Sequence, residues 1–154
     1  MSKIFISIAV CALFLVSSIA LEFKDCGSEG GKFTKVKVSN CDETANACVL
    51  KRHTNASIEL DFALDEGVDN IEQVTTVVHG VIMGVEMPFP LQNPDACKDS
   101  GVQCPLRNGV NYEYVQTLPV LRSYPKVSVT VKWALKDIAA NKTIICVYIP
   151  ARIE

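Results

Sequence analysis

The sequence has 154 residues, with 15 Lys or Arg and 17 Asp or Glu, so its formal net charge is −2 at pH 7. This length fits one domain. The mildly acidic balance, without a basic patch that contains aromatic residues, is untypical of proteins that bind nucleic acid. The charge therefore argues against a nucleic-acid partner.

The first 20 residues have the pattern of a secretory signal peptide. Lys3 supplies the positive start, residues 4–16 form an apolar run, and Ser18-Ile19-Ala20 offers small residues before a cleavage site. The run is too short for a typical membrane-spanning helix, although a single membrane anchor is the alternative. We predict a signal peptide over 1–20 and one domain over 21–154. The mature chain would keep 14 of the basic and all 17 of the acidic residues, a net charge near −3.

Six cysteines follow the predicted signal peptide, and an even number in a secreted chain predicts three disulfides with 15 possible pairings. Short polar loops separate two pairs, which favours Cys41–Cys48 and Cys97–Cys104 and leaves Cys26 with Cys146. A zinc site is a poor alternative, because the sequence contains no C-x-x-C pair and only two histidines.

The clearest strand pattern lies in the second half of residues 118–135. Large apolar side chains occupy every second position there: Val127, Val129, Val131, Trp133 and Leu135. A period of two places them on one face of a strand. Pro119 and Pro125 precede this run and cannot donate a backbone hydrogen bond, so we expect the chain to enter the strand from an edge or a bend.

Further strands are predicted over 33–38, 57–64, 74–85, 112–118 and 143–153, and residues 48–52 lead into the second of these. Residues 57–64 alternate cleanly between apolar and polar side chains. Residues 74–85 are apolar in both phases, which predicts a strand buried on both faces. No amphipathic helix is evident, so six or seven short strands with frequent turns predict an all-β sandwich.

Two asparagines lie in glycosylation sequons, Asn55-Ala56-Ser57 and Asn141-Lys142-Thr143, and both must face solvent if they carry sugar. Evidence for catalysis is weak. The sequence has no G-x-S-x-G motif and no glycine-rich phosphate loop. His53 has polar neighbours, and His79 lies inside an apolar strand, where a hydrogen-bonded structural role is the more common one.

The stretch MPFP places Phe89 between Pro88 and Pro90. Each proline fixes its own φ near −65°, so the direction of the ring is largely preset, and neither can donate to a sheet. This pattern predicts an edge strand. Phe89 could be a core residue at the end of that strand. Alternatively, it could line the entrance to an apolar cavity together with Val120 and Tyr124.

Seven segments occur in an order that resembles the Niemann–Pick type C2 family: VVHGVIMGV, MPFP, NPDAC, CPL, YxYxxTLPV, YPKVSVTVKW and IICVYIP. These proteins are small secreted sterol carriers with an ML (lipid-recognition) domain, and this chain looks like an insect member. The resemblance covers residues 21–154 and all six cysteines. It implies an immunoglobulin-like β-sandwich of two antiparallel sheets, about seven strands, with a hydrophobic lipid cavity between them. It also implies the disulfide pairing favoured above.

The resemblance further implies a lipid-binding site. The sterol would slide between the sheets past Phe89, Val120 and Tyr124, with Pro119 beside Val120 and Trp133 on the alternating strand. Val147 stands where vertebrate members carry a tryptophan, and Ala56 where our alignment places a tyrosine. No catalytic residue, metal or cofactor is implied.

The implied partners are a sterol or other lipid and an endosomal or lysosomal membrane or membrane sterol transporter. The implied protein is a monomer, secreted and present in the endosomal and lysosomal lumen. Three alternatives remain at this stage. The chain could carry another lipid (a fatty acid, a semiochemical or a microbial lipid) in chemosensation or innate immunity. It could be an adhesion or receptor module with a filled core, or an enzyme.

Overall fold

The computed structural model describes residues 21–154, so the signal peptide predicted over 1–20 lies outside the described residues. Within that range no helix is long and apolar enough to cross a membrane. Residues 21–154 form nine strands in this order: β1 (Lys24–Asp25), β2 (Gly31–Val38), β3 (Cys48–Leu50), β4 (Thr54–Leu64), β5 (Val74–Ile82), β6 (Val85–Phe89), β7 (Tyr112–Val120), β8 (Ser128–Asp137) and β9 (Lys142–Ile153).

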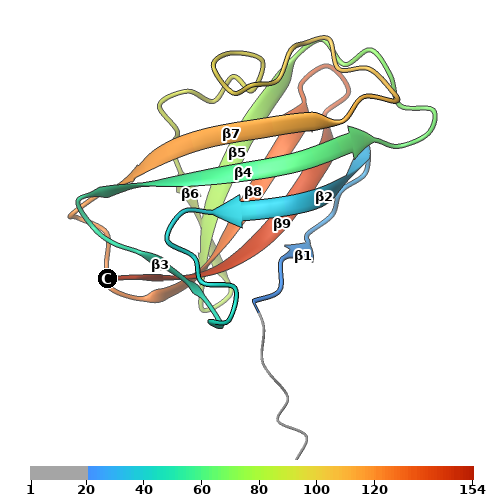
Figure 1. Cartoon of the computed structure of the whole chain (residues 1–154). Helices are drawn as coiled ribbons and strands as arrows, with labels where there is room; N and C mark the ends of the chain where they lie inside the picture. Colours follow the sequence, from blue (N-terminus) through green and yellow to red (C-terminus); the bar gives the residue numbers. More distant parts are fainter. Residues whose placement is uncertain (1–20) are drawn as a thin grey trace, which may run out of the picture.

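The strands form two sheets that face each other (Figure 1). One sheet has the order β2-β4-β7, and the other has the order β1-β9-β8-β5-β6. The strands of the first sheet cross over those of the second at an angle, as Figure 1 shows. The short strand β3 pairs with β9 in parallel, whereas every other pairing between the strands is antiparallel. The all-β sandwich predicted from the alternation is confirmed.

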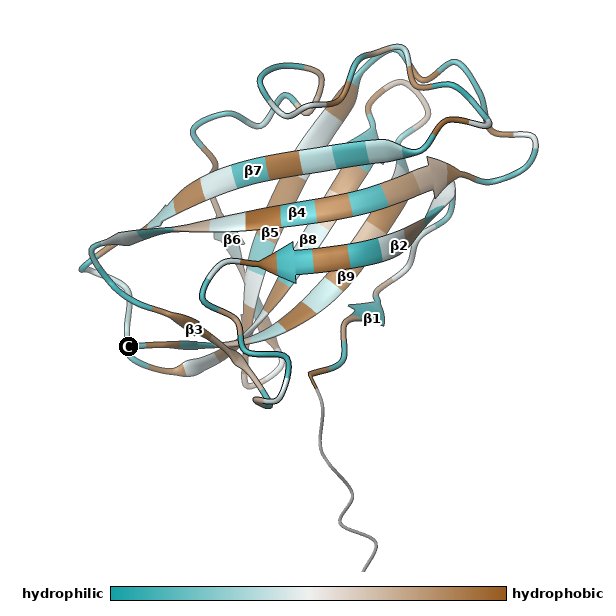
Figure 2. Ribbon diagram, in the orientation of Figure 1, coloured by the Kyte–Doolittle hydropathy of each residue, from teal (hydrophilic) through white to brown (hydrophobic). Residues whose placement is uncertain are grey.

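The period of two determines which side chains fill the space between the sheets. Strand β4 buries Ala56, Ile58, Leu60, Phe62 and Leu64, each at most 7% exposed, while the residues between them face outward. Figure 2 shows the corresponding alternation of hydrophobic and hydrophilic bands along β4. Strand β8 likewise buries Val129, Trp133 and Leu135. Burial of one face of each strand is therefore what holds the layers together.

The prediction of one continuous strand over 74–85, buried on both faces, is wrong. The chain turns at Met83 and Gly84, and the strands β5 and β6 on either side form a hairpin with β6 at the sheet edge. Met83 and Gly84 have φ values of 51° and 80°, the positive values that a two-residue type I′ turn requires. Burial alternates along β5, so only one face is covered. Apolar residues at the half-buried outward positions, such as Val77, hide this alternation in the sequence.

The described part of the chain contains three disulfides with the predicted pairing: Cys26–Cys146, Cys41–Cys48 and Cys97–Cys104. The first joins residues 120 positions apart and ties the start of the domain to β9. Closing a loop of that length stabilises a fold by about 5 kcal/mol on the chain-entropy model. This bridge therefore fixes the N-terminal segment to the larger sheet.

A polar contact joins the two layers inside the core. The hydroxyls of Thr76 on β5 and Tyr114 on β7 are 2.8 Å apart. The ring of Tyr114 packs edge-on against Trp133 of β8, with ring centroids 6.3 Å apart. Burial raises the pKa of Tyr114 to about 12, although the hydrogen bond with Thr76 opposes this shift. These groups fill one half of the sandwich and leave the other half to aliphatic side chains.

We predict that Thr76 and Tyr114 are energetically coupled. Tyr114→Phe and Thr76→Val each leave one buried hydroxyl without its partner, and each should lower the free energy of unfolding by about 1–3 kcal/mol. The double variant removes both hydroxyls and should lose clearly less than the sum of the two single effects. Urea unfolding of the four proteins measures this coupling. If the loss in the double variant equals the sum of the two single losses within about 0.3 kcal/mol, the predicted coupling is wrong.

Candidate functional site

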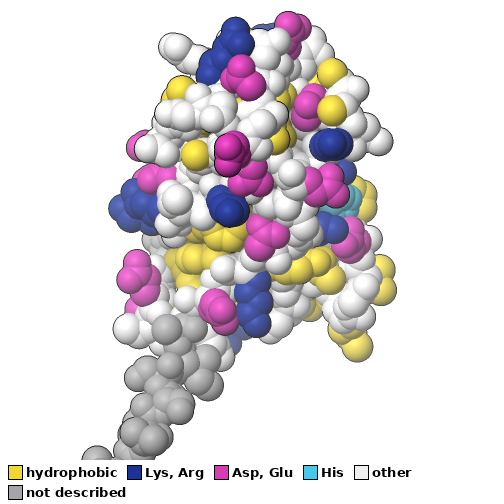
Figure 3. Space-filling view, turned by 90° about the vertical axis from the view of Figure 1, so that its right-hand side faces the viewer, with side chains coloured by type: hydrophobic (Ala, Val, Ile, Leu, Met, Phe, Trp, Pro, Cys, Tyr) yellow, Lys and Arg dark blue, Asp and Glu magenta, His cyan; other side chains and the backbone are white. Residues whose placement is uncertain are grey.

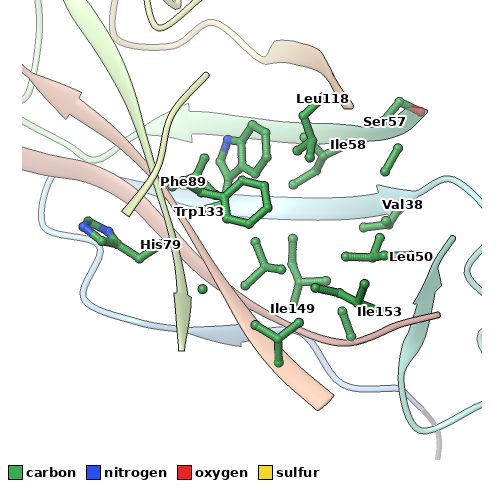
Figure 4. Close-up of a pocket in the computed structure, with 16 residues that line it drawn as sticks. Val38, Leu50, Ser57, Ile58, His79, Phe89, Leu118, Trp133, Ile149 and Ile153 are labelled. Atoms are coloured by element: carbon green, nitrogen blue, oxygen red, sulfur yellow. The ribbon is translucent and has the colours of Figure 1, made fainter. Parts of the chain in front are cut away.

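An apolar cavity lies between the sheets, in the half where β4 begins and β9 ends (Figure 4). The smaller sheet contributes Val38, Ala56, Ile58 and Leu118, and Leu50 of β3 closes one side. The larger sheet contributes alternate inward residues of β8 and β9, which are Val129, Val131, Trp133, Ile149, Ala151 and Ile153. The lining is thus the inner face of several strands rather than a single motif.

Phe89 reaches this cavity from the last residue of the edge strand β6. Its strand partner is Val78, and Figure 4 shows its ring near that of Trp133. Gly80 of β5 packs closely against Val129 beside this contact. A Cβ atom at Gly80 would lie 3.3 Å from Cγ2 of Val129 and 4.0 Å from Cδ2 of Phe89. The prediction that the MPFP stretch forms an edge strand is confirmed.

Tyr124 packs against Phe89, with ring centroids 4.6 Å apart and the planes inclined by 51°. Tyr124 lies in the loop of residues 121–127 between β7 and β8, so this contact joins that loop to β6. Burial raises the pKa of the Tyr124 hydroxyl. Both residues are half-buried, and we call Phe89 and Tyr124 the aromatic pair. The pair joins the edge of the larger sheet to the loop between β7 and β8, at the edge of the cavity.

Trp133 forms the boundary between the cavity and the filled half of the sandwich. It is 1% exposed, lines the cavity, and contacts Tyr114 on the filled side. Its two neighbours across the strands are Val78 on β5 and Val147 on β9. A guest in the cavity would therefore meet the indole ring as its deepest aromatic contact.

Of the six residues predicted to bind lipid, Phe89 and Trp133 line the cavity. The other four do not line it in this structure. Tyr124 covers Phe89 instead, and Val120 is buried where β7 ends. Pro119 is half-buried opposite Asn55, and Val147 packs beside Trp133 with no exposed surface. The motifs in the sequence predict that these residues lie near one another. Whether each side chain points into the cavity depends on the register of its strand.

Most of the aliphatic lining was missed by the search for motifs. Ile58, Val129, Val131, Ile149 and Ile153 are alternate residues of strands that the sequence analysis had identified. Their period of two shows that they face inward, but it does not show whether they meet a filled or an unfilled part of the core. The missing information is the packing of the opposite sheet.

The cavity is small, with a volume of about 50 Å³. Sites that enclose a small-molecule ligand usually have about 300–1,000 Å³. A guest of lipid size therefore requires the cavity to widen, either by side-chain movement or by separation of the sheets. An unfilled volume of this size lowers stability by about 1 kcal/mol, since the cost is roughly 24 cal/mol per Å³.

The polar residues around the cavity offer little chemistry. The imidazole of His79 points away from the other lining side chains in Figure 4, so the predicted place of His79 within the apolar strand does not put its ring in the core. His53 is exposed in a turn, with φ of 67°. Neither histidine is thus positioned to act on a guest between the sheets.

A group of carboxylates on the outer face of the smaller sheet consists of Glu59, Asp61 and Glu113. The ammonium group of Lys35 lies 2.5 Å from Glu59 and 3.8 Å from Asp61. The hydrogen bond from Lys35 lowers the pKa of Glu59. This is an ion-pair cluster on a solvated face, and surface pairs of this kind are common.

Both sequon asparagines lie on the surface. Asn55 is exposed near the start of β4, and Asn141 is exposed in the turn before β9. Exposure is what an attached sugar requires. Glycosylation at these two residues stays a prediction.

The chain matches the ML domain family model over residues 20–153. It is 55% identical over 148 residues to NPC intracellular cholesterol transporter 2 homolog a of Drosophila melanogaster, which covers 96% of this chain and 97% of that protein. It is 48% identical to the ecdysteroid-regulated 16 kDa protein of Manduca sexta, over 92% of this chain and 94% of that protein. A crystal structure of a Niemann–Pick type C2 protein from the Japanese carpenter ant matches with a TM-score of 0.80 and 34% identity, over 87% of this chain and all of that chain.

We predict that filling the cavity stabilises the protein. Ala56→Val adds two methyl groups at the lining, and a β-branched residue suits a strand, so the free energy of unfolding should rise by about 1 kcal/mol. Ala63→Val on the outward face of the same strand is the matched control and should change it by less than about 0.5 kcal/mol. Destabilisation of Ala56→Val by more than about 1 kcal/mol, measured by urea unfolding, would indicate that this half is already fully packed.

Proposed function

Because this chain belongs to the Niemann–Pick type C2 family of ML-domain proteins, we propose that it binds cholesterol or a related sterol between its two sheets and transfers it to membranes. The observation that carries the proposal is the apolar cavity bounded by Trp133 and the aromatic pair. The Drosophila relative is named as a homolog of a cholesterol transporter, which supports the choice of ligand. The aliphatic lining supports a guest with a large apolar body.

Binding is burial of the apolar body of the sterol, with the polar end near the aromatic pair. As it enters, the guest separates the Phe89 ring from Tyr124 and the inner face of β4 from that of β8, and the aromatic pair closes behind it. A sterol of about 28 heavy atoms at roughly 0.3 kcal/mol per atom gives a binding free energy near −8 kcal/mol, which corresponds to a micromolar dissociation constant. This affinity suits a carrier that must also release its guest. No covalent step, metal or cofactor takes part.

Transfer takes place at a membrane, to which the β5–β6 hairpin brings an exposed apolar tip. Met83 is 98% exposed, Val85 62% and Met87 45%. The same hairpin carries Phe89, so the tip and one member of the aromatic pair belong to one element. On the side of the molecule in Figure 3, acidic and basic side chains are interspersed. We therefore propose that the protein contacts the membrane by inserting the apolar tip, and not by electrostatic attraction of a surface with one charge sign.

The proposed setting is the secretory route, with the chain acting as a monomer in extracellular fluid and in the endosomal and lysosomal lumen. Three disulfides support passage through an oxidising compartment. A membrane-bound sterol transporter is the proposed acceptor in that lumen.

A carrier role for a fatty acid or another single-chain lipid is the second candidate, in chemosensation or innate immunity. The observation that favours it is the cavity volume of about 50 Å³, because one flexible acyl chain needs less widening than a rigid ring system. Competition between a fluorescent sterol and oleate on the purified protein separates the two. Displacement only by sterols supports the first proposal, and displacement only by oleate supports the second.

We predict that the aromatic pair contributes to sterol affinity. Phe89→Ala and Tyr124→Ala should each weaken binding of dehydroergosterol about tenfold or more, because burial of a large apolar side chain contributes roughly 1.5–3 kcal/mol. Fluorescence titration gives the dissociation constants. Val115→Ala, at an exposed position of β7, is the control and should bind as the unmodified protein does. Unchanged affinity in both aromatic variants, with folding intact, would count against the site.

We predict that the hairpin tip contributes to transfer but not to binding. Met83→Asn removes the apolar tip and places Asn-Gly in the type I′ turn, the preferred sequence for that turn, so the fold should be preserved. Sterol transfer to phospholipid vesicles should slow severalfold with an unchanged dissociation constant.

Ile138→Asn is the matched control for this test, because Ile138 is 53% exposed in the loop between β8 and β9, away from the hairpin. It should transfer sterol at the unmodified rate. Equal transfer rates for Met83→Asn and Ile138→Asn would show that the tip is not the membrane contact.

A further inference from the structure

The loop of residues 121–127 carries Tyr124 and is anchored at both ends by backbone hydrogen bonds. At its start, the amide of His53 donates to the carbonyl of Val120 at 2.8 Å. At its end, the amide of Ile153 donates to the carbonyl of Val127 at 2.9 Å. Between these anchors, in residues 21–154, the hydrogen bonds that reach the loop from other elements come from the side chain of Arg52.

The guanidinium group of Arg52 binds the middle of the loop. Its Nη1 atom donates to the carbonyl of Arg122 at 3.0 Å and to the carbonyl of Tyr124 at 3.4 Å. One Nη atom carries two hydrogens and can serve both acceptors. The backbone of Arg52 is fixed in turn, because its amide donates to the carbonyl of Glu154 at 2.9 Å. Arg52 therefore links the end of the larger sheet to the loop that carries Tyr124.

These contacts act on the aromatic pair through the backbone of Tyr124. The ring of Tyr124 lies 4.6 Å from that of Phe89, so a shift of the loop changes the contact that covers the edge of the cavity. A hydrogen bond to a charged donor is stronger than one between neutral groups. We infer that Arg52 is a positioning residue that keeps Tyr124 against Phe89 and thereby slows exchange of the guest.

This inference rests on the proposed function for its effect on lipid exchange, but its structural part does not need a ligand. Loss of the Arg52 side chain leaves the Tyr124 ring in place and removes only a restraint on its loop, so it should change the rates of entry and release together. The dissociation constant should then change little. A residue that only stabilised the fold would lower the unfolding free energy without this pattern.

The ligand experiment measures release of dehydroergosterol into excess methyl-β-cyclodextrin by stopped-flow fluorescence. Arg52→Met should release about threefold to tenfold faster, with an unchanged dissociation constant. Arg52→Lys keeps one charged donor, so its release rate should lie between those of the unmodified protein and Arg52→Met. Lys126→Met removes one positive charge from an exposed position in the same loop and should release at the unmodified rate. In a Tyr124→Ala background, Arg52→Met should change the rate by less than about 1.5-fold, because its target is missing.

The ligand-free experiment measures amide hydrogen exchange. The amide of Tyr124, which donates to the carbonyl of Leu121 at 3.2 Å, should exchange at least threefold faster in Arg52→Met, and amides of β5 should not change. Unchanged exchange at Tyr124, or equal release from Arg52→Met and Lys126→Met, would overturn the inference. Failure of the unmodified protein to bind sterol would refute the proposed function alone, since the exchange experiment would still decide the role of Arg52.

Discussion

The contact that divides this sandwich is the packing of Trp133 against Tyr114, which in turn is hydrogen-bonded to Thr76. Large rings fill the space between the sheets on one side of Trp133. On the other side the facing residues are mostly aliphatic, and they leave an unfilled volume. Because the rings and the hydroxyl pair fix the separation of the layers on the filled side, the aliphatic side can widen around a guest without loss of the whole core.

The rest of the structure supports this division. The bridge between Cys26 and Cys146 joins the start of the domain to β9, so the larger sheet is stabilised independently of the cavity. The aromatic pair lies at the edge of the cavity, where Phe89 comes from an edge strand of the larger sheet and Tyr124 from the loop between β7 and β8. An edge strand and a loop are less constrained than a central strand. Residues that must move when a guest enters need such mobility. A stable half and an adaptable half thus coexist in one domain.

Much of this could be predicted from the sequence, because the period of two in 57–64 and 127–135 leaves little choice but half-buried strands. The prolines around Phe89 likewise indicated an edge. The hairpin at Met83-Gly84 was missed, since apolar residues in both phases of 74–85 resemble a fully buried strand. Val120, Pro119 and Val147 were predicted to bind lipid but lie outside the cavity. Their positions relative to the cavity depend on strand register and on the distance between the sheets. The order of residues in a chain determines neither of these.

The most direct measurement is a crystal structure of the protein with a bound sterol. We expect that the ring system lies between β4 and β8, that Phe89 and Tyr124 remain in contact at the edge of the widened cavity, and that Trp133, Tyr114 and Thr76 keep the contacts described above. A sterol bound on the outer surface would contradict it. So would a sterol that reaches the space between the sheets only by breaking the contact between Trp133 and Tyr114.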